Sequence, residues 1–333
     1  MKTVILCDLP QQVASVYAPE VIDRLKSLTD TDGLCHTKAE ILAHPQQFAD
    51  TAYVFSTWGM PTFTEEEIHA YLPSLRCVFY AAGSVQAFAR PFLNCGVRVF
   101  SAWAANAVPV AEFTVAQIIL AGKDYFCQTA LLKKKDWAAT ASRRGPHIGN
   151  YRKRVGLIGC GMIGSMVARR LQAFDLEVVA FDPFMSPEKA ERLGVTPCSL
   201  EELFATCSVV SNHLANNAET QGMLRYAHFS SMPPYATFIN TGRGAQVIED
   251  DLVRALTERP DLVALLDVTN PEPSPLDHPF YTLPNCFLTP HIAGSLGGEV
   301  VRMAEYMVTE YQAWVSDQPC AYEVNLKMLE TMA

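Results

Sequence analysis

Residues 155–164 read Val-Gly-Leu-Ile-Gly-Cys-Gly-Met-Ile-Gly, an apolar run that leads directly into a Gly-x-Gly-x-x-Gly pattern. The apolar part, Val155–Ile158, is typical of a buried strand, and the residues after the glycines have helical periodicity. A second β-rich run ends at Asp182, eighteen residues after Gly164. Strand, glycine-rich turn, helix and strand in this order predict a β-α-β unit with an acidic residue at the end of its second strand.

This unit has the chemistry of a dinucleotide-binding site. Glycines allow a tight turn and let the backbone approach a pyrophosphate, whose negative charge faces the N-terminus of the helix. Asp182 is placed to accept hydrogen bonds from the adenosine ribose, and its charge repels a 2′-phosphate, so NAD is the predicted cofactor. The alternative is a glycine-rich turn that packs a helix on a strand, beside a solvated Asp182. The predicted contacts in the motif are Gly159, Gly161, Met162, Ile163 and Gly164.

Short β-rich runs alternate with helical stretches on both sides of this unit, which predicts mostly parallel sheets covered on both faces. The expected strands are Val4–Cys7, Tyr53–Ser56, Cys77–Ala81, Val97–Phe100, Val155–Ile158, Val178–Phe181, Val209–His213, Thr237–Asn240, Val263–Asp267 and Cys286–Thr289. The expected helices include Pro19–Ser27, Thr64–Ala70 with a Thr-x-x-Glu capping box, Val85–Leu93, Asn106–Ala121 with Asn106 as N-cap, and the amphipathic tail Leu296–Val315.

Length and composition limit the possible classes of protein. A chain of 333 residues is long enough for two domains, and 49% hydrophobic residues exclude a disordered chain. The net charge of −9 argues against nucleic acid or an anionic membrane as the main partner, and the basic run Lys133–Lys135 is interpreted as a solvated face.

The most apolar stretch, Val108–Ala121, is interrupted by Glu112 and Gln117 and is shorter than a membrane span, so no transmembrane segment is expected. The ten cysteines form no Cys-x-x-Cys pair and no zinc-ligand spacing. We therefore expect reduced thiols, no metal and a cytoplasmic location.

Three further segments each follow a predicted strand, at the edge of a doubly wound sheet where ligands bind. Arg243 follows Thr237–Asn240, and its forked guanidinium suits a carboxylate. Glu272 follows Val263–Asp267. His291 follows Cys286–Thr289 and could act as acid and base near neutral pH. Taken singly, each has a structural alternative: an ion-paired arginine, a surface carboxylate and a satisfied loop histidine.

Together these segments resemble the D-isomer-specific 2-hydroxyacid dehydrogenase family, over nearly the whole chain and most densely from Val155 to Gly294. The resemblance implies that Arg243 binds the substrate carboxylate and carbonyl. It implies that Glu272 raises the basicity of His291, and that His291 is the acid/base. It further implies two doubly wound parallel-sheet domains: a Rossmann NAD-binding domain over 103–291, and a flavodoxin-like substrate domain over 1–102 completed by 292–333.

The resemblance also assigns contacts outside the glycine motif. On the cofactor side these are Asp182, His213, Leu214, Thr220, Thr241, Gly242, Asp267 and Gly294. On the substrate side they are Trp58, Ala82, Gly83 and Arg243. Several positions depart from the family pattern, among them Trp103 where a proline is common and Gln86 near the place of a usual aspartate. These departures leave the substrate open, although Glu272 counts against formate, because formate dehydrogenases of this fold carry glutamine there.

The expected function is an NAD-dependent oxidoreductase that interconverts a small 2-oxoacid and a D-2-hydroxyacid in a cleft between two domains. The alternative is a non-catalytic NAD(H)-sensing binding protein of the same fold. A methyltransferase is a weaker rival, because it would not need the arginine, glutamate and histidine. The apolar helix Asn106–Ala121 and the arm that follows it, up to about Arg152, correspond to the segments through which family dimers make contact. The resemblance therefore predicts a homodimer.

Overall fold

The computed structural model describes residues 2–145 and 147–330. The chain forms two compact units, each with its own core. Unit 1 contains residues 1–107 and 295–333, and unit 2 contains residues 108–294. The sequence interpretation placed the boundaries after residues 102 and 291.

Unit 1 is built on a six-stranded sheet with the order β13-β5-β4-β3-β1-β2. All neighbours pair in parallel except β13, which runs antiparallel to β5 at the edge. The strands are β1 Lys2–Leu6, β2 Cys35–His36, β3 Thr51–Ser56, β4 Cys77–Tyr80, β5 Arg98–Ser101 and β13 Glu323–Val324. The order 2-1-3-4-5 is that of flavodoxin-like sheets, as expected.

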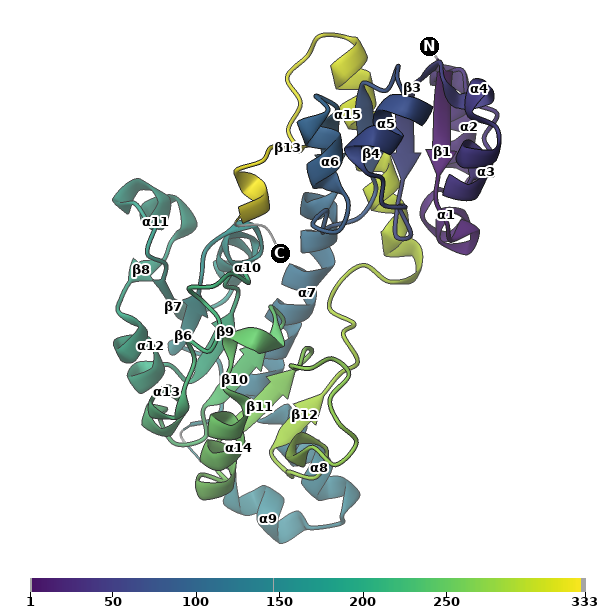
Figure 1. The fold of residues 1–333 in the computed structure, drawn as a ribbon. Helices are drawn as coiled ribbons and strands as arrows, with labels where there is room; N and C mark the ends of the chain where they lie inside the picture. The colour runs from purple at the N-terminus through teal and green to yellow at the C-terminus, as the bar shows by residue number, and fades with distance from the viewer. Residues whose placement is uncertain (1, 146, 331–333) are drawn as a thin grey trace. The chain divides into compact units, whose positions relative to one another are not determined.

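The helices of unit 1 lie on the two faces of this sheet (Figure 1). They are α1 Pro10–Val16, α2 Pro19–Leu28, α3 Lys38–Ala43, α4 Pro45–Phe48, α5 Glu65–Tyr71, α6 Ala89–Asn94 and α15 Val301–Val315. The predicted capping box at the start of α5 is present: Thr64 caps the Glu67 amide and Glu67 caps that of Thr64. Helix α15 packs on β4 and β5, where Tyr311 contacts the rings of Phe55 and Phe79 edge-on.

Unit 2 is built on a seven-stranded parallel sheet with the order β12-β11-β10-β9-β6-β7-β8. The strands are β6 Lys153–Ile158, β7 Leu176–Phe181, β8 Thr196–Pro197, β9 Val209–Asn212, β10 Thr237–Asn240, β11 Val263–Leu266 and β12 Cys286–Leu288. The helices are α8 Tyr125–Lys133, α9 Trp137–Ser142, α10 Met162–Leu171, α11 Pro187–Leu193, α12 Leu200–Thr206, α13 Tyr226–Ser231 and α14 Glu249–Glu258. Counted from β6, the strand order is 3-2-1-4-5-6 with one further strand, which is the Rossmann arrangement.

Helix α7, Trp103–Gly122, links the two units and corrects two expectations. Asn106 lies inside the helix and is not its N-cap; its side-chain oxygen accepts a bond from the Ser295 amide at 3.0 Å. The helix has 20 residues and is, by length and composition, long and apolar enough to cross a membrane. The expectation that this apolar stretch is shorter than a membrane span is therefore wrong. Half of its most apolar part is buried, and the core helix of a soluble protein passes the same test.

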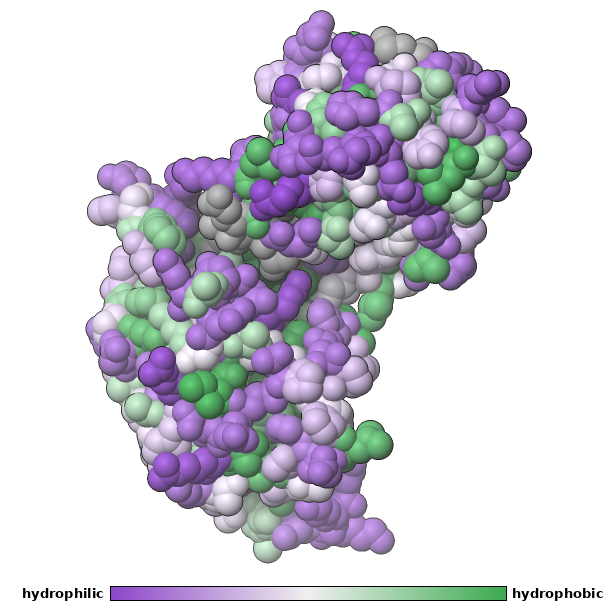
Figure 2. Space-filling model, viewed as in Figure 1, coloured by the Kyte–Doolittle hydropathy of each residue, from purple (hydrophilic) through white to green (hydrophobic). Residues whose placement is uncertain are grey.

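The sequence interpretation also misplaced or missed several short elements. Helix α6 begins at Ala89 and not at Val85. The two-residue strands β2, β8 and β13 were not expected. On the face seen in Figure 2 hydrophilic residues predominate, and the apolar patches are small and separate.

Candidate active site

The glycine loop between β6 and α10 has the geometry that a bound pyrophosphate needs. Gly159 has a φ of +84°, and a Cβ there would lie 2.9 Å from the His213 carbonyl oxygen. A Cβ on Gly164 would lie 2.0 Å from the Gly159 oxygen, so only glycine lets α10 pack this closely. A Cβ on Gly161 would meet nothing within 4 Å. The loop therefore presents open backbone at the N-terminus of α10, which fits a dinucleotide phosphate.

Asp182 stands directly after β7, beside the glycine loop. One carboxylate oxygen accepts the Cys160 amide at 2.9 Å, and the other accepts the Phe184 amide at 2.8 Å. The carboxylate is thus fixed next to the loop, where the ribose of a bound dinucleotide is expected. Burial raises the pKa of the Cys160 thiol to about 11, so this cysteine is protonated at neutral pH.

The segment after β9 packs against the glycine loop: the His213 amide donates to the Ile158 carbonyl at 2.7 Å. The His213 ring bonds through Nε2 to the Ser211 hydroxyl at 3.0 Å, and its buried Nδ1 has no partner. Burial lowers the pKa of His213 to about 4, so the ring is neutral at pH 7. The predicted cofactor contact Leu214 follows, and its carbonyl accepts the Gln246 side chain at 2.8 Å.

The other predicted cofactor residues lie on the connections that follow β9, β10 and β12. Thr220 closes a turn by donating to the Ala215 carbonyl at 2.6 Å. Thr241 is buried, and its hydroxyl bonds to that of Thr114 in α7 at 3.1 Å. Gly242 donates its amide to Asn240 at 3.1 Å. Gly294 ends the turn that carries His291.

His291 and Glu272 are in direct contact. The imidazole Nδ1 lies 2.6 Å from a carboxylate oxygen of Glu272, and the two side chains are 46% and 41% exposed. His291 has a φ of +53°, a conformation that non-glycine residues rarely adopt and that is often found at functional sites. With Nδ1 held by the carboxylate, Nε2 is left to exchange a proton with a ligand.

Asp267 holds the turn that carries His291. Its buried carboxylate accepts bonds from the amides of Ile292 at 2.8 Å and Ala293 at 2.9 Å, and from the Thr289 hydroxyl at 2.5 Å. The Asp267 carbonyl also accepts the His291 amide at 3.1 Å. These bonds give Asp267 a positioning role that the sequence interpretation, which assigned it to the cofactor, did not include.

Arg243 leaves the end of β10 and is held by a buried amide network. The Asn240 side chain donates to the Arg243 carbonyl at 3.0 Å and accepts from Asn212 at 3.0 Å. Asn212 also donates to Gln246 at 2.5 Å. One guanidinium nitrogen of Arg243 donates to the Gly242 carbonyl at 2.8 Å. The network fixes the backbone of this turn.

The three predicted catalytic residues follow adjacent strands. Arg243 comes after β10, Glu272 after β11 and His291 after β12, and these strands are parallel neighbours. A Cβ on Gly244 would lie 2.1 Å from the Thr269 carbonyl carbon, so the loops after β10 and β11 touch. The three side chains therefore share one edge of the sheet. Among these three, the described hydrogen bonds join only His291 to Glu272 directly.

The predicted substrate residues belong to unit 1. Trp58 follows β3, and its carbonyl accepts the Cys7 thiol at 3.1 Å. Ala82 and Gly83 follow β4, and both of their carbonyls accept the Ser101 hydroxyl, at 2.9 and 2.7 Å. All three residues thus lie at the C-terminal edge of the first sheet, the edge where ligands bind in such sheets.

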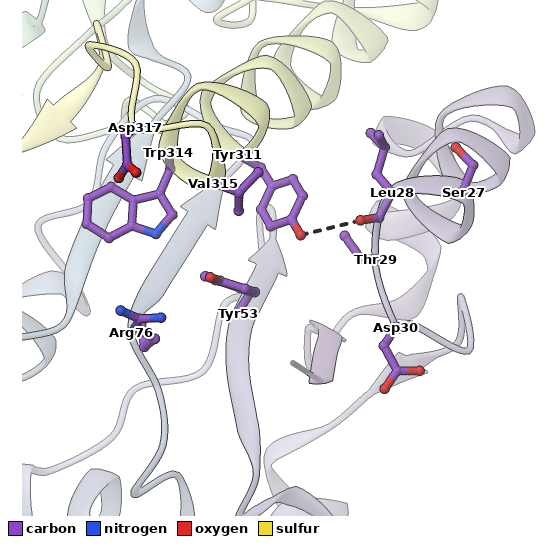
Figure 3. Close-up of a pocket in the computed structure, with 10 residues that line it drawn as sticks. All are labelled: Ser27, Leu28, Thr29, Asp30, Tyr53, Arg76, Tyr311, Trp314, Val315 and Asp317. Carbon is purple, nitrogen blue, oxygen red and sulfur yellow. Dashed lines mark hydrogen bonds between the residues drawn. The ribbon is translucent and has the colours of Figure 1, made fainter.

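One cavity of unit 1 lies elsewhere and contains none of the predicted site residues. It has a volume of about 550 Å³ and opens near the N-terminal ends of β3 and β4 (Figure 3). Its lining residues are Ser27, Leu28, Thr29, Asp30, Tyr53, Arg76, Tyr311, Trp314, Val315 and Asp317.

The sequence does not reveal the residues that hold the loops of the predicted site residues in place. Glu249 accepts the Asn270 amide at 2.8 Å and lies 3.3 Å from His278, and so holds the loop that carries Glu272. Gln246 and Asn212 hold the Arg243 turn. Lys189 lies 3.6 Å from Asp182. No local pattern marks these residues: only Asn212 ends a strand, Glu249 and Lys189 lie in the first turns of α14 and α11, and most of their partners are distant in sequence.

Comparison with known proteins gives the family. The model of the NAD-binding domain of D-isomer specific 2-hydroxyacid dehydrogenases matches residues 115–293, more than half of the chain. D-3-phosphoglycerate dehydrogenase of Mycobacterium tuberculosis is 34% identical over 200 residues, which are 60% of this chain and 37% of that protein. The chain therefore matches well under half of the length of this relative.

Solved structures show the same fold. D-mandelate dehydrogenase of Rhodotorula graminis has a TM-score of 0.80 at 18% identity, with 97% of each chain covered. A glyoxylate reductase of Paecilomyes thermophila has a TM-score of 0.71 at 21% identity, covering 97% of this chain and 98% of that one. The matched domain and the open glycine loop make NAD the cofactor of unit 2. The chain belongs to the D-isomer specific 2-hydroxyacid dehydrogenase family.

Proposed function

We propose that the protein is an NAD-dependent oxidoreductase that interconverts a small 2-oxoacid and the corresponding D-2-hydroxyacid. The observation that carries this proposal is the 2.6 Å contact between His291 and Glu272, on the sheet edge that also presents Arg243. This edge combines a proton carrier, a carboxylate to stabilise its charged form and a fork for an anionic substrate. A protein that only bound NAD would need none of the three.

Each residue has a defined task in the reducing direction. Arg243 binds the substrate carboxylate with its forked donors and polarises the neighbouring carbonyl. Protonated His291, oriented by Glu272 at Nδ1, donates a proton from Nε2 to the carbonyl oxygen, which becomes the hydroxyl. Bound NADH supplies the hydride that the carbonyl carbon receives. In the oxidising direction neutral His291 takes the hydroxyl proton back at Nε2. Backbone amides near Ala82 and Gly83, and Trp58, are proposed to contact the substrate.

The test is NADH consumption with glyoxylate, hydroxypyruvate, pyruvate and larger 2-oxoacids. We expect turnover with at least one of them, and a loss of two orders of magnitude or more for His291→Asn. His44→Asn is the matched control, because His44 is exposed and its side chain makes no capping bond to α4. NADH binding without turnover of any 2-oxoacid would instead favour the NAD(H)-sensing protein. We also propose a cytoplasmic location.

A further inference from the structure

The positive charge of Lys189 lies beside the Asp182 carboxylate, which is expected to accept hydrogen bonds from the cofactor ribose. The ammonium of Lys189 lies 3.6 Å from the Asp182 oxygen that also accepts the Cys160 amide. The Lys189 side chain is partly exposed, whereas that of Asp182 is only 8% exposed. The pair therefore sits at the surface of the site, with the lysine on the solvent side.

The fold fixes this lysine near the site. Lys189 belongs to the first turn of α11, which follows β7 after a short connection. The Ser186 hydroxyl caps the helix by accepting the Lys189 amide at 3.2 Å. The cap fixes the backbone of Lys189, whereas the flexible four-carbon stem of its side chain lets the ammonium turn toward an anion close to Asp182.

The charges of Asp182 and Lys189 affect whether NADH or NADPH binds more tightly. An isolated carboxylate at this position repels the 2′-phosphate of NADPH. The ammonium of Lys189 carries a charge opposite to that of Asp182 at 3.6 Å, so it offsets much of the repulsion between the Asp182 carboxylate and a 2′-phosphate. Loss of the Asp182 charge would leave an uncompensated cation beside the ribose, which is a binding feature for phosphate.

We propose that Lys189 is a second determinant of cofactor choice: it limits the discrimination by Asp182 against NADPH, and it becomes a ligand of the 2′-phosphate when a substitution removes the Asp182 charge. The wild-type protein then prefers NADH by a modest factor. The inference concerns the cofactor site alone and does not depend on the proposed reaction.

The experiment measures the dissociation constants of NADH and NADPH for the full chain by calorimetry, so that catalysis is not needed. We expect Lys189→Gln to weaken NADPH binding by about five- to tenfold, with NADH changed less than about twofold. Lys189→Arg should keep the wild-type ratio. Lys133→Gln is the control for loss of one positive charge elsewhere in unit 2, and it should leave both constants unchanged.

A double-mutant cycle separates a direct role from a structural one. Asp182→Asn should bind NADPH more tightly than NADH, and adding Lys189→Gln should remove that preference. The salt dependence of NADPH binding should be steeper with Lys189 present. An unchanged NADPH-to-NADH ratio in Lys189→Gln, an equal loss of both cofactors, or the same ratio in Asp182→Asn with and without Lys189 would each overturn the proposal.

Discussion

At the scale of single residues, the contact between Glu272 and His291 makes the activity of substituted proteins a test of the site. Glu272→Gln keeps the shape of the side chain but replaces the carboxylate at Nδ1 with a neutral amide. We expect kcat for 2-oxoacid reduction to fall modestly, because His291 keeps its Nε2 proton donor but loses its charged partner.

The effect of Glu272→Gln should be small compared with the loss of the histidine. Both side chains are more than two-fifths exposed, so water screens their interaction. The control is Glu219→Gln, because Glu219 is an exposed carboxylate of the same unit. An unchanged kcat in Glu272→Gln, together with loss of activity in His291→Ala, would assign Glu272 to loop structure alone.

The lowered pKa of His213 leads us to expect that unit 2 loses stability in acid. An unfolded histidine takes up a proton below about pH 6.5, whereas His213 stays neutral in the folded protein down to about pH 4, because its Nδ1 is shielded from water and has no partner. The folded state thus binds fewer protons in this range, and stability falls as the pH is lowered through it, by roughly 3 kcal/mol when complete. Calorimetric melting of wild type and His213→Gln between pH 7 and 5 should show the shallower slope in the variant. Equal slopes of melting temperature against pH in the two proteins would contradict this role of His213.

At the scale of elements, the turn after β12 depends on the side chain of Asp267. In Asp267→Asn one oxygen becomes an NH₂ group that faces a backbone donor, which leaves the amide of either Ile292 or Ala293 without an acceptor, because the two amides bond to different oxygens. A buried unsatisfied group costs about 1–3 kcal/mol. We expect a lower melting temperature and a fall in kcat, since the turn also carries His291. Asp251→Ala, which removes the acceptor of the Tyr226 amide, should affect melting more than kcat.

The elements also show what the sequence could predict. Strands such as Thr237–Asn240 and Val155–Ile158 were expected because they are buried on both faces and therefore read as continuous apolar runs. The edge strands Cys35–His36 and Thr196–Pro197 are too short and too exposed to leave such a pattern. Asn106 looked like a cap because its local sequence allowed it, but its partner is 189 positions away.

The same limit applies to the site. Arg243, Glu272 and His291 were assigned from their motifs, and strand order then explains why they share an edge. The bonds that orient them come from Gln246, Glu249 and the Asp267 carboxylate. These depend on tertiary contacts between different loops, which no local pattern records.

At the scale of the whole molecule, we predict a homodimer formed through the arm of unit 2. Helices α8 and α9 are tied together by a bidentate pair between Arg143 and Asp124, with both distances 2.7 Å. This arm exposes large apolar side chains, among them Trp137, which is 65% exposed. Covering them in a partner removes apolar surface from water, at about 25 cal/mol per Å².

Light scattering at micromolar concentration should report twice the chain mass, and Trp137→Asp should raise the dissociation constant of the dimer. Leu276→Asp is the matched control, because Leu276 is 96% exposed in a different loop of unit 2. A monomer at these concentrations, or an equal effect of both substitutions, would rule out this arm as the interface.

The construction of unit 1 from both ends of the chain has a consequence for biosynthesis. Its core needs Tyr311 of α15 against Phe55 and Phe79, and β13 beside β5. A ribosome makes these partners only after the whole of unit 2, a delay of roughly 10–40 s at about 5–20 residues per second. Until then the first hundred residues expose an apolar sheet face to solvent. Unit 2, which is continuous in the chain, can fold in that interval, so the nascent N-terminal segment is the part that most needs a chaperone.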